Sequence, residues 1–97
     1  MVKHIVTFTL SGTPEERLAL SRSFRDALMA LPGVVPCLQS MEVGINQNPA
    51  ESADVVLTAC VATMDDVAAY AGHPAHVAAA SLLKGHVAQR CCVDYEV

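Results

Sequence analysis

Charged and aromatic side chains are scarce in this chain of 97 residues. Only 16% of the residues are charged, against about 25% in a typical domain, and tryptophan is absent. The hydrophobic content of 53% exceeds the usual ~45–50%. Such a chain forms one domain, residues 1–97, which buries roughly 60–65% of the surface of its unfolded chain. Because so small a domain cannot hide all of this apolar surface, the composition predicts self-association.

Positive charge is sparse and scattered. The six basic residues form no stripe with interleaved aromatic residues, and the net charge is -4. Both facts argue against binding to nucleic acid or to an anionic membrane surface. No apolar run is long enough to span a bilayer. The segment Met1–His4 leads into an alternating pattern rather than the apolar core of a signal peptide, so we expect a cytoplasmic protein.

The cysteines offer no recognisable motif. Cys37, Cys60, Cys91 and Cys92 form no Cys-x-x-Cys pair and no ligand-like pairing with histidine. They predict buried free thiols in a reducing compartment rather than a disulfide framework. Cys91 and Cys92 are adjacent in a predicted strand, so their side chains should point to opposite faces of a sheet.

Motifs for cofactors and metals are also missing. The sequence has no glycine-rich phosphate loop and no Gly-x-Ser-x-Gly. His73 and His76 have the spacing of helical metal ligands, but Pro74 between them distorts the helix start and no acidic residue lies nearby in sequence. We therefore expect neither a metal nor a cofactor.

Hydrophobic periodicity and capping residues predict four strands and three helical segments. The expected strands cover 2–10, 34–44, 54–62 and 91–97, and the expected helices cover 13–30, 63–72 and 74–89. Since the last two helices are one helix broken at His73–Pro74, the order is βαββαβ. This order predicts an α+β, ferredoxin-like fold, with a four-stranded antiparallel sheet and the helices on one face.

The segment 54–62 predicts how the second face of the sheet is covered. Val55, Leu57 and Val61 alternate with Val56 and further small apolar residues, so neither face of this strand is clearly polar. The helices of the chain can cover only one of these faces. A second subunit would cover the other, which predicts a homodimer built as a dimeric α+β barrel.

The segment Tyr70–Val77 carries much of the reactive chemistry in an otherwise apolar chain. Gly72 ends one helix and Pro74 begins the next, so Tyr70 and His76 can reach one point beneath the helices. His4 lies on the more apolar face of the first strand and approaches from the sheet. An apolar wall around these three groups would form a small-molecule pocket, and its expected residues are Val6, Phe8, Phe24 and Leu57.

Several segments together resemble the Dabb family, the stress-responsive dimeric α/β-barrel domain. They are Met1–Val6, Leu31–Gly33, Glu42–Gly44, Tyr70–Val77 and Val93–Glu96, and the similarity extends over nearly the whole chain. The resemblance implies a dimeric barrel. The resemblance extends to polyketide cyclases of the olivetolic acid cyclase type, which use a histidine base and a neighbouring tyrosine. By that match Tyr70 and His76 are the catalytic pair, and His4 is an assisting histidine.

Two functions are compatible with these observations. In the first, the dimer binds a small, partly apolar carbonyl or phenolic compound and acts as a cofactor-independent cyclase, lyase or isomerase. His76 then removes a proton next to a carbonyl, and Tyr70 holds or protonates the oxyanion. In the second, the protein is a non-enzymatic stress-responsive dimer, in which Tyr70 and His76 stabilise the helix break.

Overall fold

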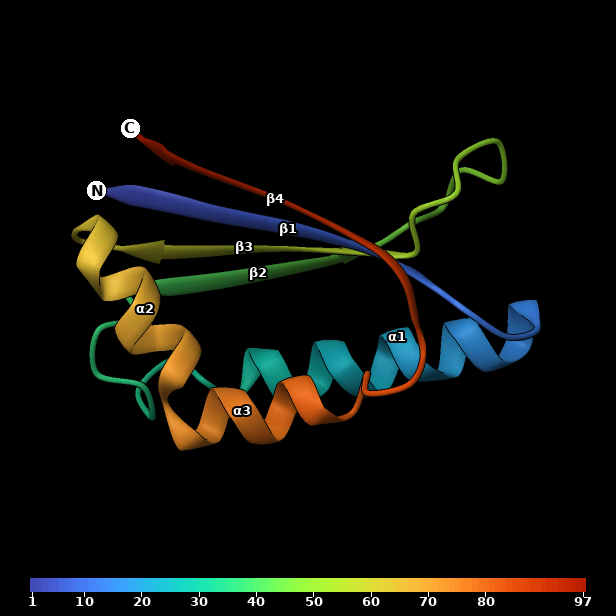
Figure 1. The fold of residues 1–97 in the computed structure, drawn as a ribbon, viewed down its shortest axis with the longest axis horizontal. Coiled ribbons are helices and arrows are strands. Elements are labelled where there is room, and N and C mark those ends of the chain that lie inside the picture. Colours follow the sequence, from blue (N-terminus) through green and yellow to red (C-terminus); the bar gives the residue numbers. More distant parts are fainter.

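The computed structural model describes residues 1–97 and has the predicted α+β, ferredoxin-like order (Figure 1). The four strands are β1 (Val2–Leu10), β2 (Ser40–Ile45), β3 (Val55–Val61) and β4 (Val87–Glu96). The three helices are α1 (Pro14–Met29), α2 (Met64–Gly72) and α3 (Pro74–Ser81). None of the helices is both long enough and apolar enough to cross a lipid bilayer.

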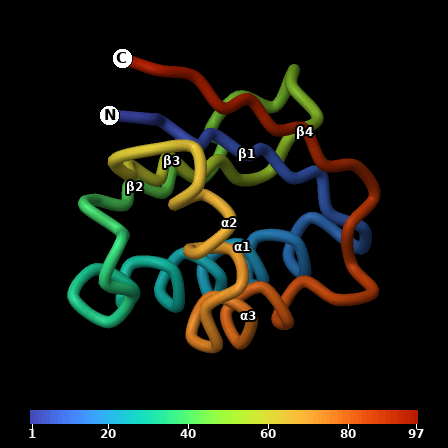
Figure 2. The backbone as a smooth tube through the Cα atoms, turned by 60° about the vertical axis from the view of Figure 1, so that its left-hand side comes forward, coloured from blue at the N-terminus to red at the C-terminus, as the bar shows by residue number.

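The strands form one antiparallel sheet in the order β2-β3-β1-β4. All three helices lie on the same side of this sheet, and α1 and α3 run alongside each other (Figures 1 and 2). The two ends of the chain lie close together, and the backbone N–H of Val97 donates to the carbonyl of Met1 at 2.9 Å. The predicted sheet and its one-sided cover of helices are confirmed.

Local sequence accounts for the helix starts. Thr13 caps α1, because its hydroxyl accepts the N–H of Glu16 and the Glu16 carboxylate accepts the N–H of Thr13. His73 separates α2 from α3 in an extended conformation, with φ -64° and ψ 135°. Its Nδ1 accepts the N–H of Ala75 at 3.0 Å, so His73 is the capping residue at the helix break.

The core lies between the sheet and the helices. On β1, alternate residues such as His4 and Val6 face the helices, and their partners on β3 are Ala59 and Leu57. The helix α1 turns one face to the sheet, on which Phe24 and Leu28 are almost fully buried. The largest side chains with almost no exposed surface are those of Tyr70, Phe24, Leu28, Val6, Val35, Val55, Val61 and Ser21.

The opposite face of the sheet carries no helix (Figure 1). Ile5 on β1 pairs with Thr58 and Val93 at the centre of this open face. Val56 is 36% exposed and Val93 is 61% exposed. Exposed apolar residues on an uncovered sheet face are typical of an interaction surface.

Three predicted boundaries are wrong, and one of them is the start of the last strand, which lies at Val87 rather than Cys91. The alanine-rich helix ends at Ser81 instead of near residue 89, because Gly85 adopts a positive φ of 81° and the chain reverses there. Residues from Val87 onward then pair with β1 as β4, and backbone pairing prevails over the helix propensity of alanine. The second strand begins at Ser40 rather than residue 34, and Pro36 lies in a turn.

The predicted burial of all four thiols is also wrong. Cys60 is buried, but Cys91 and Cys92 are exposed on β4. The reason is that β4 is an edge strand that the helices do not cover. The two thiols still point to opposite faces, because Cys92 pairs with helix-facing Val6 while Cys91 pairs with Thr7 on the open side.

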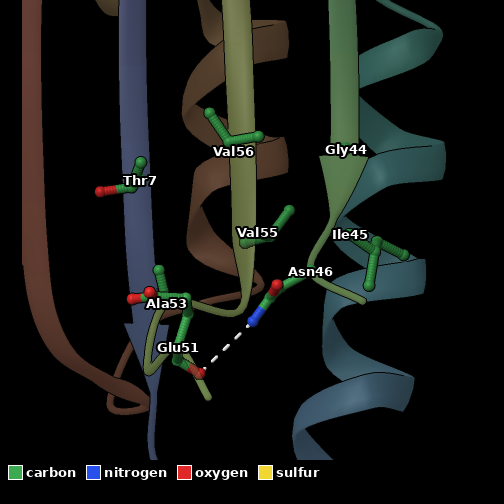
Figure 3. Close-up of a pocket in the computed structure, with 8 residues that line it drawn as sticks. All are labelled: Thr7, Gly44, Ile45, Asn46, Glu51, Ala53, Val55 and Val56. Carbon is green, nitrogen blue, oxygen red and sulfur yellow. Dashed lines mark hydrogen bonds between the residues drawn. The ribbon is translucent and has the colours of Figure 1, made fainter. Parts of the chain in front are cut away.

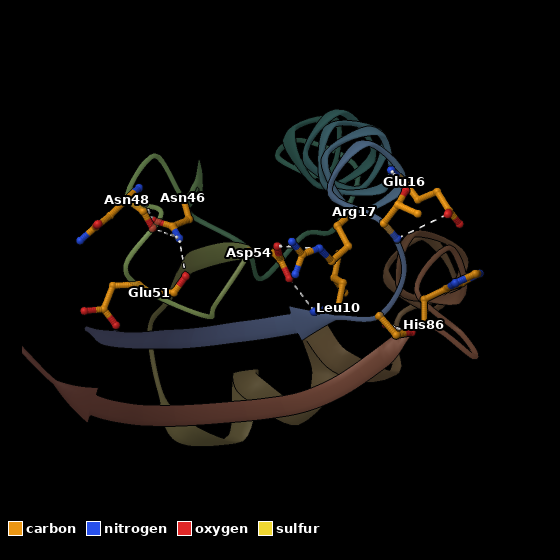
Figure 4. Close-up of polar contacts among 10 residues, drawn as sticks. Leu10, Glu16, Arg17, Asn46, Asn48, Glu51, Asp54 and His86 are labelled. Atoms are coloured by element: carbon orange, nitrogen blue, oxygen red, sulfur yellow. Dashed lines mark hydrogen bonds and ion pairs between the residues drawn. The ribbon is translucent and has the colours of Figure 1, made fainter.

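Asp54 connects the end of β1 to α1 and to the loop before β3 (Figure 4). Its Oδ2 accepts the backbone N–H of Leu10 at 2.7 Å, and its Oδ1 lies 3.9 Å from Nε of Arg17. Its own backbone N–H donates to the carbonyl of Phe8 at 2.8 Å. Asp54 therefore holds the end of β1 and links it to α1.

We expect Asp54→Ala to lower the free energy of unfolding by about 1–3 kcal/mol, because the N–H of Leu10 loses its acceptor and the guanidinium of Arg17 loses its ion-pair partner. Glu51→Ala in the same loop is the matched control. It should change stability by less than about 0.5 kcal/mol, since Glu51 uses only backbone groups. Urea unfolding measures both variants, and equal losses would contradict the role given to Asp54.

Candidate functional site

A cavity of about 610 Å³ lies between the helix-facing side of the sheet and the helices α2 and α3. Ten of its 14 lining residues are hydrophobic. All four residues predicted as an apolar wall line it, namely Val6, Phe8, Phe24 and Leu57. The rings of Phe8 and Phe24 meet edge to face, with centroids 5.5 Å apart. The size and apolar lining are those of a small-molecule site, and ligand binding by these residues stays a prediction.

His76 lines this cavity from the first turn of α3. Its Nδ1 lies 2.9 Å from the carbonyl oxygen of Ala71. Since a carbonyl only accepts, Nδ1 carries the proton, and Nε2 is left with a lone pair and no partner in the protein. Burial lowers the pKa of His76. The hydrogen bond to Ala71 raises this pKa, whereas the charges of His4 and Arg90 lower it. Near neutral pH the ring is therefore an uncharged base with a fixed orientation.

Tyr70 lies behind the cavity wall, between the two histidines. Its side chain is fully buried and is not among the lining residues. Its ring centroid is 4.5 Å from that of His76 and 5.8 Å from that of His4. The hydroxyl has no hydrogen-bond partner. Burial, with a smaller effect of Cys37, raises the pKa of Tyr70, so the hydroxyl keeps its proton.

His4 enters the cavity from β1, as predicted. Its Nδ1 is hydrogen-bonded to the carboxylate of Asp94 on the neighbouring strand β4. Sγ of Cys92, two residues earlier on the same face of β4, lies 3.6 Å from the same nitrogen. Although Cys92 is exposed, the groups around its thiol remove part of its water, and this partial desolvation and the carboxylate of Asp94 raise the pKa of Cys92.

Sequence reasoning missed three polar residues of the cavity, Arg90, Cys92 and Asp94. Arg90 was not expected here because the sequence places it beside the end of a helix, whereas it lies on β4 opposite Phe8. No carboxylate lies within ion-pair distance of its guanidinium. The missed signal was the alternation of Arg90, Cys92 and Asp94, which puts all three on one face of a strand.

A second hollow of about 330 Å³ lies where β2 and β3 meet the loop that joins them (Figure 3). Thr7 and Val56 contribute to it from the open face of the sheet, and Asn46 donates to the Glu51 carbonyl at 3.4 Å. Its only charged residue is Glu51. It contains no histidine or cysteine, whereas the helix-side cavity has both, so the helix-side cavity is the candidate site.

We expect Tyr70→Phe to leave the free energy of unfolding unchanged or to raise it by about 1 kcal/mol. The hydroxyl is buried without a partner, and removing such a group relieves its desolvation cost. Thermal unfolding monitored by circular dichroism measures this. A loss of stability greater than about 1 kcal/mol would show that the hydroxyl is a structural hydrogen-bonding group.

Solved structures share this architecture. A dimeric protein of unknown function with a ferredoxin-like fold from Bacteroides fragilis is 43% identical, with a TM-score of 0.95 and coverage of 99% of this chain and 95% of that one. A dimeric ferredoxin-like protein of unknown function from Thermobifida fusca is 26% identical, with a TM-score of 0.81 and coverage of 99% and 90%. No curated protein matches the chain.

An antibiotic biosynthesis monooxygenase shares the fold at 13% identity, with a TM-score of 0.78 and coverage of 100% of this chain and 98% of that one. At this identity the likeness concerns the fold alone. The sequence profile of the stress responsive A/B barrel domain matches residues 2–97, which is nearly the whole chain. The predicted resemblance is confirmed, and the chain belongs to the Dabb family of stress responsive A/B barrel domains.

Proposed function

We propose that the helix-side cavity binds a small, partly apolar carbonyl or phenolic compound and that His76 acts on it as a general base. The observation that carries this proposal is the fixed, uncharged imidazole in an apolar cavity. Its Nδ1–H is held by the Ala71 carbonyl, so Nε2 offers its lone pair to a ligand. A weakly solvated neutral base of this kind can take a proton near neutral pH.

In the proposed reaction, Nε2 of His76 takes the proton from a carbon next to a substrate carbonyl. The electrons of the broken C–H bond form an enolate, whose oxygen carries the negative charge. The enolate then attacks a second carbonyl, or receives a proton back at another carbon, and His76 returns its proton to the product. These steps need no cofactor. They are those of a cofactor-independent cyclase, lyase or isomerase.

Two further groups are proposed to stabilise the enolate. Arg90 lines the cavity without an ion-pair partner and offers a positive charge. Tyr70 retains its proton and has no acceptor in the protein, so its hydroxyl is free to donate to the oxyanion. Because Tyr70 is fully buried, this donation requires the substrate oxygen to reach behind His76. The reaction rate of Tyr70→Phe separates the two roles of this residue. A slower reaction would indicate direct donation by the hydroxyl, and an unchanged rate would indicate that Tyr70 only positions its neighbours through its ring contacts.

The alternative is a non-enzymatic dimer in which the same residues hold the helix break. The full burial of Tyr70 between two imidazole rings favours this alternative. The unpartnered hydroxyl and the free Nε2 of His76 oppose it, because a purely structural pair would use these polar atoms. The two functions differ in what His76 contributes, and His76 is therefore the residue to change.

We expect His76→Asn to reduce proton abstraction by about 10²–10⁴-fold, because the amide of asparagine can still donate to Ala71 but has no basic nitrogen. Deuterium uptake next to the carbonyl of aryl ketones and β-diketones, followed by proton NMR in D₂O, measures this. In the natural protein the rate should rise with pH to a plateau, with the midpoint of the rise below about 6.5, since the pKa of His76 is lowered.

The control for this experiment is His86→Asn, which changes an exposed histidine outside the cavity. It should leave the rate and its pH dependence unchanged. If His76→Asn keeps the natural rate but loses more than about 2 kcal/mol of stability, the proposed base is wrong and the histidine is structural.

We also infer that the chain forms a homodimer through the open face of its sheet. This inference is supported by the exposed apolar residues of that face and by the dimeric relatives. Two such faces packed together would form the barrel predicted from sequence. Each subunit then keeps its own helix-side cavity on the side away from the partner.

Val56→Asp should convert the dimer to monomers or unfolded chains, because it places a carboxylate without a partner in the interface. Val77→Asp on α3 is the matched control, since Val77 is 54% exposed but lies on a helix. Sedimentation analysis at equal concentrations measures both. A folded dimer of Val56→Asp would contradict the proposed interface.

A further inference from the structure

Three metal-ligating side chains of different chemistry meet on the sheet side of the cavity. They are the imidazole of His4 on β1 and the thiol of Cys92 and the carboxylate of Asp94 on β4. One ligand atom from each lies within 4.8 Å of the others. No other group of three such residues in the chain satisfies this geometry.

The backbone fixes this arrangement. His4 and Asp94 are directly paired across the antiparallel β1–β4 ladder, and Cys92 is two residues from Asp94 on the same face. His4 is buried, and its ring packs edge to face against Tyr70. The imidazole is therefore held in place before any ligand binds, as a metal site requires.

The edges of the cluster that involve Cys92 are close to those of a tetrahedral site. Sγ of Cys92 lies 3.6 Å from Nδ1 of His4 and 3.8 Å and 3.9 Å from the two carboxylate oxygens of Asp94. Metal–ligand bonds of about 2.0–2.3 Å at tetrahedral angles place neighbouring ligand atoms roughly 3.3–3.8 Å apart. The hydrogen bond between His4 and Asp94 is shorter than such an edge, so the carboxylate has to move away from the imidazole when a cation replaces the shared proton.

A nucleophilic triad does not fit the same residues. In such a triad the imidazole accepts from the nucleophile with one nitrogen and donates to the carboxylate with the other. Here Cys92 and Asp94 both face Nδ1 of His4, so the ring cannot relay a proton between them. Three donors that converge on one point instead suit a cation.

We propose that His4, Cys92 and Asp94 bind one divalent metal ion of the zinc type. Nitrogen and sulfur donors select zinc and its neighbours over magnesium or calcium. The three ligands leave one position open, and because all three residues line the cavity, that position faces it. The positive charge of Arg90, on the same face of β4, repels the cation. The thiolate of Cys92 and the carboxylate of Asp94 supply two negative charges that attract it. The inference does not depend on the reaction proposed for His76.

Cobalt(II) titration of the metal-free, reduced protein tests the site, because cobalt replaces zinc and its spectrum reports a thiolate ligand. We expect one cobalt ion per chain, a sulfur-to-cobalt charge-transfer band and the visible bands of four-coordinate cobalt. Zinc should remove these bands by competition. Because zinc binds only the folded site, it should also raise the temperature of unfolding.

Cys92→Ser should abolish the charge-transfer band, and Asp94→Asn should weaken binding at least about tenfold, since even supporting groups around a metal contribute 10–100-fold. Cys91→Ser is the matched control. Its thiol is adjacent in sequence but faces the other side of the sheet, so binding should remain complete. His76→Asn should also bind cobalt fully, which separates this site from the proposed reaction.

If the natural protein shows no charge-transfer band after cobalt is added, the proposal is wrong. The same conclusion follows if Cys92→Ser keeps the band, or if Cys91→Ser loses it to the same extent. Circular dichroism of each variant confirms that it is folded, and the exposed position of both thiols on the edge strand makes this the expected result.

Discussion

The register of β1 between β3 and β4 is the constraint on which the rest of the structure depends. Because side chains alternate along a strand, this register puts His4, Val6 and Phe8 beneath the helices and Ile5 on the open face. A shift of one residue would exchange the two sets. The cavity and the surface proposed for dimerisation are thus two consequences of one pairing, and Asp54 fixes the end of that pairing by holding Leu10.

The parts of the site that follow from local periodicity were predictable. His4 and Phe8 follow from alternation along β1, and Phe24 follows from the helical stripe of α1. Arg90 was not predictable in the same way, because its place depends on where the alanine-rich segment stops being a helix. Gly85, with its positive φ, allows the turn that ends this segment, and a glycine here was a signal for a helix end that the prediction did not use. Asp94 lies in the predicted last strand, but its place beside His4 depends on the register of β4 with β1.

The position of Tyr70 shows a different limit of sequence reasoning. Its place in the last turn before Gly72 correctly put it beside His76, with the ring centroids 4.5 Å apart. Helical position does not determine whether the hydroxyl opens into the cavity, because that depends on the packing of the rings around it. The structure buries this hydroxyl behind the wall without a partner, and the cavity is lined by the histidines instead.

The candidate site therefore has two sides with different chemistry. On the helix side, His76 offers an uncharged base whose orientation is set by the Ala71 carbonyl. On the sheet side, His4 is tied to Asp94 and lies beside a thiol, which suits a cation. Tyr70 packs between the two imidazoles and fixes their separation. Both sides face one apolar cavity, so a ligand that enters it contacts both histidines.

The most direct test of this account is an NMR titration of the four histidine rings with a small library of phenols and β-dicarbonyl compounds. Ligand binding in the helix-side cavity should shift the ring protons of His76 and His4. The rings of His73, which caps α3, and of exposed His86 should not move. If no compound moves His76 or His4, or if the shifts occur only at His86, the helix-side cavity is not the binding site.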